Sequence, residues 1–193
     1  MPIKETLSAV AITLTFIAFI PYIRSILRGE VKPHVFSWVI WGATTLIVFF
    51  AQINDNGGAG AWPTGISSLI TLYVAYLAFK LRADISIAKA DWWFFYGALS
   101  SLPLWYFTAD PLWAVVILTL VDLAGLAPTL RKAYEYPHQE QPLFFALIAL
   151  RNSIAISALE HYSTTTLLFP AAIAINCLIL VVLINYRRRV SSP

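Results

Sequence analysis

Seven apolar runs, each close to the length of a membrane-spanning helix, follow one another along the chain with short connections between them. A helix of about 20 residues is about 30 Å long, which matches the hydrocarbon core of a bilayer. Hydrophobic residues make up 59% of the chain and charged residues only 12%, a balance that soluble domains do not have. We therefore predict an all-α membrane protein with seven transmembrane helices, at residues 7–27, 35–53, 61–81, 92–108, 112–130, 143–158 and 164–186.

The basic residues fall in alternate connections and at the end of the chain, which predicts how the helices are oriented. Lys and Arg are concentrated in cytoplasmic connections of membrane proteins. The first, third and fifth connections and the C-terminus are therefore expected in the cytoplasm, with the N-terminus outside. Because the net charge of +3 lies beside the spans, it does not indicate nucleic-acid binding. The basic residues of these connections and of the C-terminus are Arg24, Arg28, Lys32, Lys80, Arg82, Lys89, Arg131, Lys132 and Arg187 to Arg189; Lys4, beside Glu5 at the N-terminus, and Arg151, within a span, lie outside this pattern.

Two parts of the chain match one another at a constant shift of 107 positions. Several matches at one shift indicate an internal repeat of three helices. Because three is an odd number, an extra helix between the repeats would give them the same orientation in the membrane. We expect a first triple-helix repeat at residues 1–83, a linker helix within 84–110 and a second repeat at 111–193. The matches place Pro21 over Pro128, Arg24 over Arg131 and Trp62-Pro63 over Phe169-Pro170; a two-residue insertion places Phe36 over Phe145.

This 3+1+3 arrangement, with a proline near the cytoplasmic end of the first helix of each repeat, resembles the SWEET/PQ-loop transporter superfamily. The resemblance covers nearly the whole chain. Within the superfamily, the chain resembles bacterial seven-span members. It implies two parallel three-helix bundles in a bacterial inner (cytoplasmic) membrane, and transport of sugars or amino acids through a central cavity. It also implies a hinge role for four prolines, Pro21, Pro33, Pro128 and Pro142.

The chain departs from the family at several positions that bear on the substrate. The Pro-Gln pair of the family reads Pro21-Tyr22 and Pro128-Thr129 here. Sugar-carrying members place an asparagine in the third helix of each repeat, whereas this chain has Thr64 and Ala171. The pocket tryptophans of the family correspond to Trp38 or Trp41 in the first repeat and to Leu147 and Leu150 in the second. The substrate class therefore stays open among sugars, amino acids and vitamin-like solutes.

Two ionisable residues lie inside predicted spans, where a charge costs about 3 kcal/mol or more at the helix centre. Asp122 and Arg151 are expected at similar depth in the second repeat, with the amides Asn152 and Asn176 nearby. In the first repeat, Thr15 matches Asp122 at the same shift. Two interpretations remain open: a structural ion pair, or a cavity in which Arg151 holds an anionic group and Asp122 binds a cation or a proton. The candidate substrate-binding residues are Asp122, Arg151, Asn152, Asn176, Trp41 and Thr15.

The function that fits these features best is transport of a small polar solute by alternating access around a site at the membrane midplane. A receptor or scaffold of the same fold, or an intramembrane enzyme, are the alternatives; no paired acid and base or Ser-His arrangement within the spans favours an enzyme. We expect no cofactor and no metal site, because the histidines are not spaced as ligands and Cys177 is the single cysteine. The expected partners are the lipid bilayer, the solute and a proton coupled through Asp122, with a homo-oligomer left open and no nucleic acid.

Overall fold

The computed structural model describes residues 2–30, 33–81, 89–140 and 142–190. Nearly all of these residues are helical, which confirms the predicted all-α class. The expected boundary at residue 83 lies outside the described residues. The helices are α1 (Pro2–Leu27), α2 (Val35–Asn54), η1 (Gly58–Ala61), α3 (Trp62–Lys80), α4 (Lys89–Thr108), α5 (Pro111–Glu135), η2 (Pro137–Gln139), α6 (Pro142–Ser157) and α7 (Thr164–Val190).

Several of these helices are long and apolar enough to cross a membrane. By length and composition, four candidates occur in the described residues: α1, α2, the segment Gly58–Lys80 and α7. Shorter apolar stretches occur in α5 and in α6. Large apolar side chains such as Leu143 and Val182 point outward, while polar groups such as Thr15 and Asn152 are buried. A soluble helical protein hides its apolar faces, so this distribution is typical of a membrane-embedded protein.

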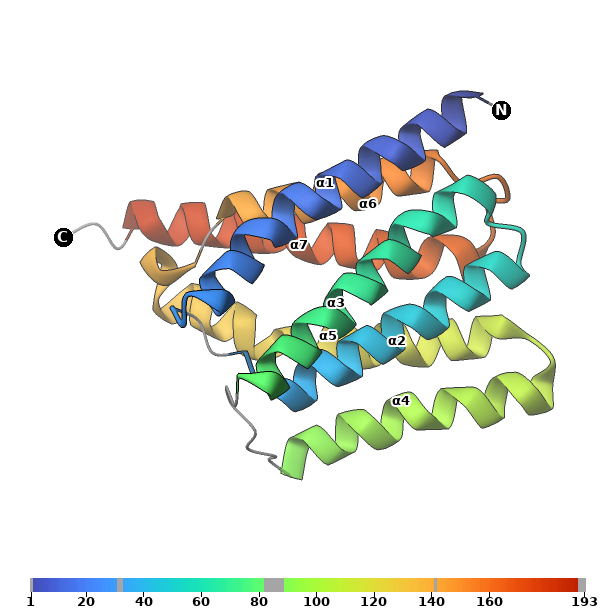
Figure 1. The fold of residues 1–193 in the computed structure, drawn as a ribbon, viewed down its shortest axis with the longest axis horizontal. Helices are drawn as coiled ribbons and strands as arrows, with labels where there is room; N and C mark the ends of the chain where they lie inside the picture. Colours follow the sequence, from blue (N-terminus) through green and yellow to red (C-terminus); the bar gives the residue numbers. More distant parts are fainter. Residues whose placement is uncertain (1, 31–32, 82–88, 141, 191–193) are drawn as a thin grey trace.

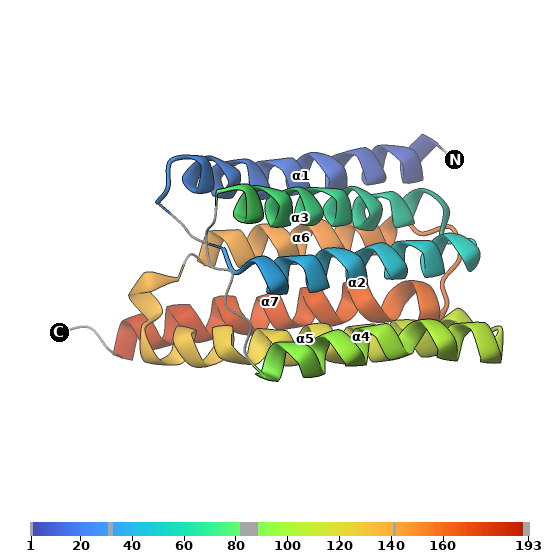
Figure 2. The ribbon, with the colours of Figure 1, turned by 60° about the horizontal axis from the view of Figure 1, so that its bottom comes forward.

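The helices run roughly along one direction and form a single bundle (Figures 1 and 2). In the first half, α3 packs against both α1 and α2; in the second half, α7 packs against both α5 and α6. Between the halves, α1 contacts α6 and α2 contacts α5. Helix α4 lies at the edge of the bundle beside α5. We call the end where α1 begins the N-terminal end, and the end where α7 finishes the C-terminal end.

At the N-terminal end, small residues let the two halves approach closely. The turn after α2 has positive φ angles at Asn56 and at Gly58. Glycine adopts such angles at low cost because it has no Cβ atom. Gly60 lies so close to the connection between α6 and α7 that a Cβ atom on it would be 2.4 Å from the backbone nitrogen of Leu159. A side chain at position 60 would therefore push the halves apart.

The four expected hinge prolines occupy two kinds of position. Pro21 lies inside α1 and is exposed, and position 128 lies inside the helical backbone of α5, although its side chain is outside the described part. Pro33 precedes α2, and Pro142 is the first residue of α6, where a missing N–H costs nothing. Only the first two positions can therefore interrupt a helical hydrogen-bond ladder.

Candidate functional site in the bundle core

Arg151 is the centre of a buried polar network that joins three helices. Its side chain is 5% exposed. Nε donates to Thr15 Oγ1 of α1 at 3.1 Å, Nη1 donates to Asn152 Oδ1 at 2.9 Å, and Nη2 donates to the carbonyl of Pro63 at the start of α3. All three acceptors are neutral, and the guanidinium forms no ion pair with a carboxylate that the structure describes.

The two partner side chains of Arg151 are themselves fixed. Thr15 is fully buried and donates its hydroxyl proton to Ala11 O at 2.9 Å, which leaves the oxygen free to accept from Arg151. Asn152 donates through Nδ2 to Ile148 O at 2.9 Å and so turns Oδ1 toward the guanidinium. These second bonds orient the acceptors, so the network is preorganised around a fixed positive charge.

Asp122 does not pair with Arg151 in this structure, so the ion pair, one of the two interpretations left open by the sequence, is not formed here. Within the described residues, the Asp122 carboxylate has no hydrogen bond and no ion pair. Asp122 lies eleven residues after Pro111, where α5 begins, and Arg151 lies six residues before Ser157, where α6 ends. The similar depth expected for the two residues stays a prediction.

The carboxylate oxygens of Asp122 keep some accessible surface, although the residue as a whole is only 9% exposed. Among the described residues, Gln52 Oε1 is the one side-chain polar atom that has no accessible surface and no hydrogen-bond partner. The Asp122 oxygens also have no partner among these residues, so they must be accessible. One turn further along α5, Gly125 lies against Trp41 of α2, whose Nε1 would be 3.1 Å from a Cβ atom there. On α7, the Cys177 thiol is within electrostatic range of both Asp122 and Arg151.

The predicted site residues therefore fall into two groups. Thr15, Arg151 and Asn152 are joined by hydrogen bonds. Trp41 lies against Gly125, one turn along α5 from Asp122, and Asn176 is half-buried without a hydrogen-bond partner among the described residues.

An aromatic cluster adjoins this region on the side of the C-terminal end. Tyr22 of α1 stacks on Trp38 of α2 at 5.2 Å between ring centroids, and Trp38 meets Trp41 edge-on at 5.7 Å. Phe19 of α1 contacts Phe144 of α6 at 6.3 Å, and so crosses between the two halves. Trp38 and Trp41 therefore pack against other aromatic rings of α1 and α2 in the bundle.

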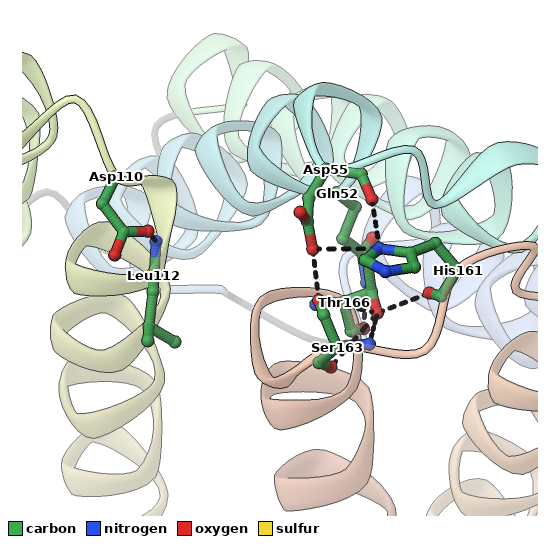
Figure 3. Close-up of polar contacts among 7 residues, drawn as sticks. All are labelled: Gln52, Asp55, Asp110, Leu112, His161, Ser163 and Thr166. Carbon is green, nitrogen blue, oxygen red and sulfur yellow. Dashed lines mark hydrogen bonds and ion pairs between the residues drawn. The ribbon is translucent and has the colours of Figure 1, made fainter.

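At the N-terminal end, polar bonds connect the end of α2 to the connection before α7 (Figure 3). Gln52 Nε2 donates to Thr166 O at 2.9 Å, and Ser163 Oγ donates to the Asp55 carboxylate. His161 Nδ1 lies 3.0 Å from Asp55 O and 3.6 Å from its carboxylate. The backbone adds a bond from Glu160 N to Gly57 O at 3.1 Å. None of these residues was singled out from the sequence; the available signal was Pro170, which leaves the Thr166 carbonyl without a helical donor.

Asp55, His161 and Ser163 have the residue types of a hydrolytic triad but not its geometry. The Ser163 hydroxyl donates to the carboxylate, whereas an activated serine donates to the imidazole. The described part of the chain also holds no group of three or more His, Cys, Asp or Glu side chains that could bind a metal ion. This cluster therefore has the geometry of a connection between helices.

Fold and site together define an all-helical, membrane-embedded protein with an unpaired acid and a fixed guanidinium in its core. Comparison with protein-family models, with curated proteins and with solved structures found no match to this chain.

Proposed function

We propose that this protein is a membrane transporter that moves a small polar solute by alternating access, with two parallel three-helix repeats joined by α4. The observation that carries the proposal is the reciprocal contact between the halves: α1 packs on α6, and α5 packs on α2. If α1 to α3 correspond to α5 to α7, these two contacts are the same contact viewed from each half. That relation is what a two-fold axis along the membrane normal would produce.

The proposed solute site is the region between the halves that contains Asp122 and the Arg151 network. A carboxylate that is buried at this depth without a partner is costly unless it binds a proton, a cation or a polar solute. Arg151 offers fixed positive charge, and two of its five N–H groups have no described acceptor. In this proposal Asp122 binds the solute's cationic or hydroxyl group or a coupled proton, and Arg151 attracts an anionic group.

The closure of the bundle supports an alternating-access cycle. The halves are bonded by polar groups at the N-terminal end, whereas the cross-contact identified toward the C-terminal end is aromatic. We infer a conformation that is closed at the N-terminal end, which the distribution of basic residues places outside the cell. Opening would break the bonds around Asp55 and Gln52.

Two experiments test the proposal. Thermal unfolding of the purified protein would be followed with sugars, amino acids, vitamins and organic acids; a transported solute should raise the melting temperature of wild type but not of Asp122→Asn. Asp110→Asn, at the α4–α5 turn, is the control and should retain the response.

Separately, Asp122→Cys in a Cys177→Ala background should react with a water-soluble thiol reagent, faster from the C-terminal side. A protein that no solute stabilises, with a cysteine at position 122 that stays unreactive from both sides, would contradict transport and favour a scaffold.

A further inference from the structure

A groove of about 480 Å³ runs along the outside of the bundle between α1 and α3 at the N-terminal end. Its lining changes from acidic to apolar along the bundle. Glu5 of α1 and Glu160 of the α6–α7 connection, with Gly58 and Ala59, line the part nearest the N-terminal end, which we call its mouth. Further along α1 and α3 come Ser8 and Trp62, and then Ile12 and Ile66. From Glu5 to Ile12 the groove covers about 10 Å along α1.

The two carboxylates at the mouth form no ion pair with the side chains that the structure describes. The basic residue beside them is Lys4, which precedes Glu5 in the chain. Its ammonium donates to the carbonyl of Leu159, the residue before Glu160, and lies 5.5 Å from the centroid of the Tyr162 ring, so its charge is directed to these two groups. One Glu160 oxygen accepts from Ala59 N at 3.5 Å, which orients the side chain across Gly58 and leaves the other oxygen free.

Ser8 gives a second and independent indication that the groove holds a ligand. Its side chain is 6% exposed and lines the groove, yet its hydroxyl has no partner among the described residues. Thr6, Thr13 and Thr15 of the same helix all bond a carbonyl one turn earlier. A hydroxyl in a membrane helix normally does the same, so an unpartnered one facing a groove is available to a bound molecule.

We propose that this groove binds a phospholipid whose headgroup carries a primary ammonium, such as phosphatidylethanolamine. The ammonium has three N–H donors and no acceptor, which suits a mouth with two carboxylates that form no ion pair with Lys4, the one basic residue described beside them. The Ser8 hydroxyl donates to a phosphate or ester oxygen below it. Ile12 and Ile66 contact the first part of an acyl chain, and Trp62 lies at the depth where tryptophan anchors in the interface.

The dimensions agree with this occupant. The headgroup region of each leaflet is roughly 5–7 Å thick, so a groove that covers about 10 Å spans the headgroup and the start of the hydrocarbon. An anionic lipid would place its charge between Glu5 and Glu160, where like charges repel. The proposal concerns the outside of the bundle and does not depend on transport through its centre.

Native mass spectrometry tests the inference on the full-length protein purified in detergent. The protein is exposed to equal amounts of phosphatidylethanolamine and phosphatidylglycerol, with EDTA present so that no divalent ion bridges an anionic lipid to the carboxylates. Wild type should retain about fivefold more phosphatidylethanolamine than phosphatidylglycerol. In the Glu5→Gln/Glu160→Gln variant the two lipids should be retained equally. Glu30→Gln, an exposed acid at the opposite end, is the matched control and should keep the wild-type preference.

A second variant tests the groove without changing its charge. Ala9→Phe fills the groove from an exposed position of α1 and should lower retention of phosphatidylethanolamine while the protein melts near the wild-type temperature. The inference is overturned if wild type shows no preference for phosphatidylethanolamine. It is also overturned if the preference survives in the double variant, or if Ala9→Phe retains as much lipid as wild type. Because none of these substitutions touches Asp122 or Arg151, this result is separate from the outcome of the transport experiments.

Discussion

Gln52 of α2 supplies the hydrogen bond that Pro170 denies to Thr166 of α7. In a regular helix the carbonyl of residue 166 would accept from the N–H of residue 170, but proline has none. The Gln52 Nε2 atom donates to this carbonyl at 2.9 Å, and the Gln52 side chain is completely buried. A defect inside one helix is thus satisfied by a side chain from the other half of the protein.

This relationship predicts a rescue by a second substitution. Gln52→Leu should lower the free energy of unfolding by about 1–2 kcal/mol, because the buried Thr166 carbonyl loses its donor. Pro170→Ala restores an N–H at the helical position, so Gln52→Leu/Pro170→Ala should regain most of that loss. Thermal unfolding in detergent measures both. Equal melting temperatures for the single and double variants would show that the carbonyl is satisfied in another way.

The contact between Thr15 and Arg151 predicts a difference between two threonines of α1. Thr15→Val removes the acceptor of Arg151 Nε inside the bundle and should cost about 1–3 kcal/mol. Thr13→Val is the control, since Thr13 is exposed and bonds only its own helix at Ala9 O. It should change stability by less than about 0.5 kcal/mol. If both variants melt together with wild type, the guanidinium is not held by Thr15.

Gly60 predicts that the N-terminal end tolerates no added side chain. Gly60→Ala would place its Cβ atom 2.4 Å from backbone nitrogen of Leu159, so the backbone itself would have to move. We expect a loss of about 1–3 kcal/mol, as for other overpacked sites. At Gly97 the nearest atom is a side-chain methyl of Val121 at 3.1 Å, which can shift. Gly97→Ala should therefore be neutral or stabilising, and a melting temperature as low as that of Gly60→Ala would contradict this comparison.

The bonds around Asp55 predict that linking the halves at the N-terminal end stops transport. Asp55→Cys and Ser163→Cys, in a Cys177→Ala background, would be joined by a short bis-methanethiosulfonate reagent. Because the two positions bond directly in the closed conformation, cross-linking should be efficient. Solute uptake into proteoliposomes should fall to background and return when the link is reduced. Full uptake by the linked protein would show that this end does not open during the cycle.

The helical segments could be predicted from sequence because each apolar run ends in polar or turn-forming residues, although only four of the described helices are long and apolar enough to cross a membrane. The runs predicted at 35–53 and 164–186 correspond to Val35–Asn54 and Thr164–Val190. The partners of the buried polar groups could not be predicted in this way: Asp122 and Arg151 do not bond one another, and Arg151 bonds Thr15 of α1 instead.

What the sequence alone determined is therefore an all-helical, membrane-embedded chain and the approximate extent of its helices, to within five residues at their ends. The tertiary structure decided which polar groups meet: Arg151 with Thr15 and with the Pro63 carbonyl, and Gln52 with Thr166. These partners are far apart in the chain. The physical reason is that helices in lipid are apolar on every side, so their periodicity does not indicate which face points inward. Close packing of the small and polar side chains sets that face, and it becomes visible only when the helices are assembled.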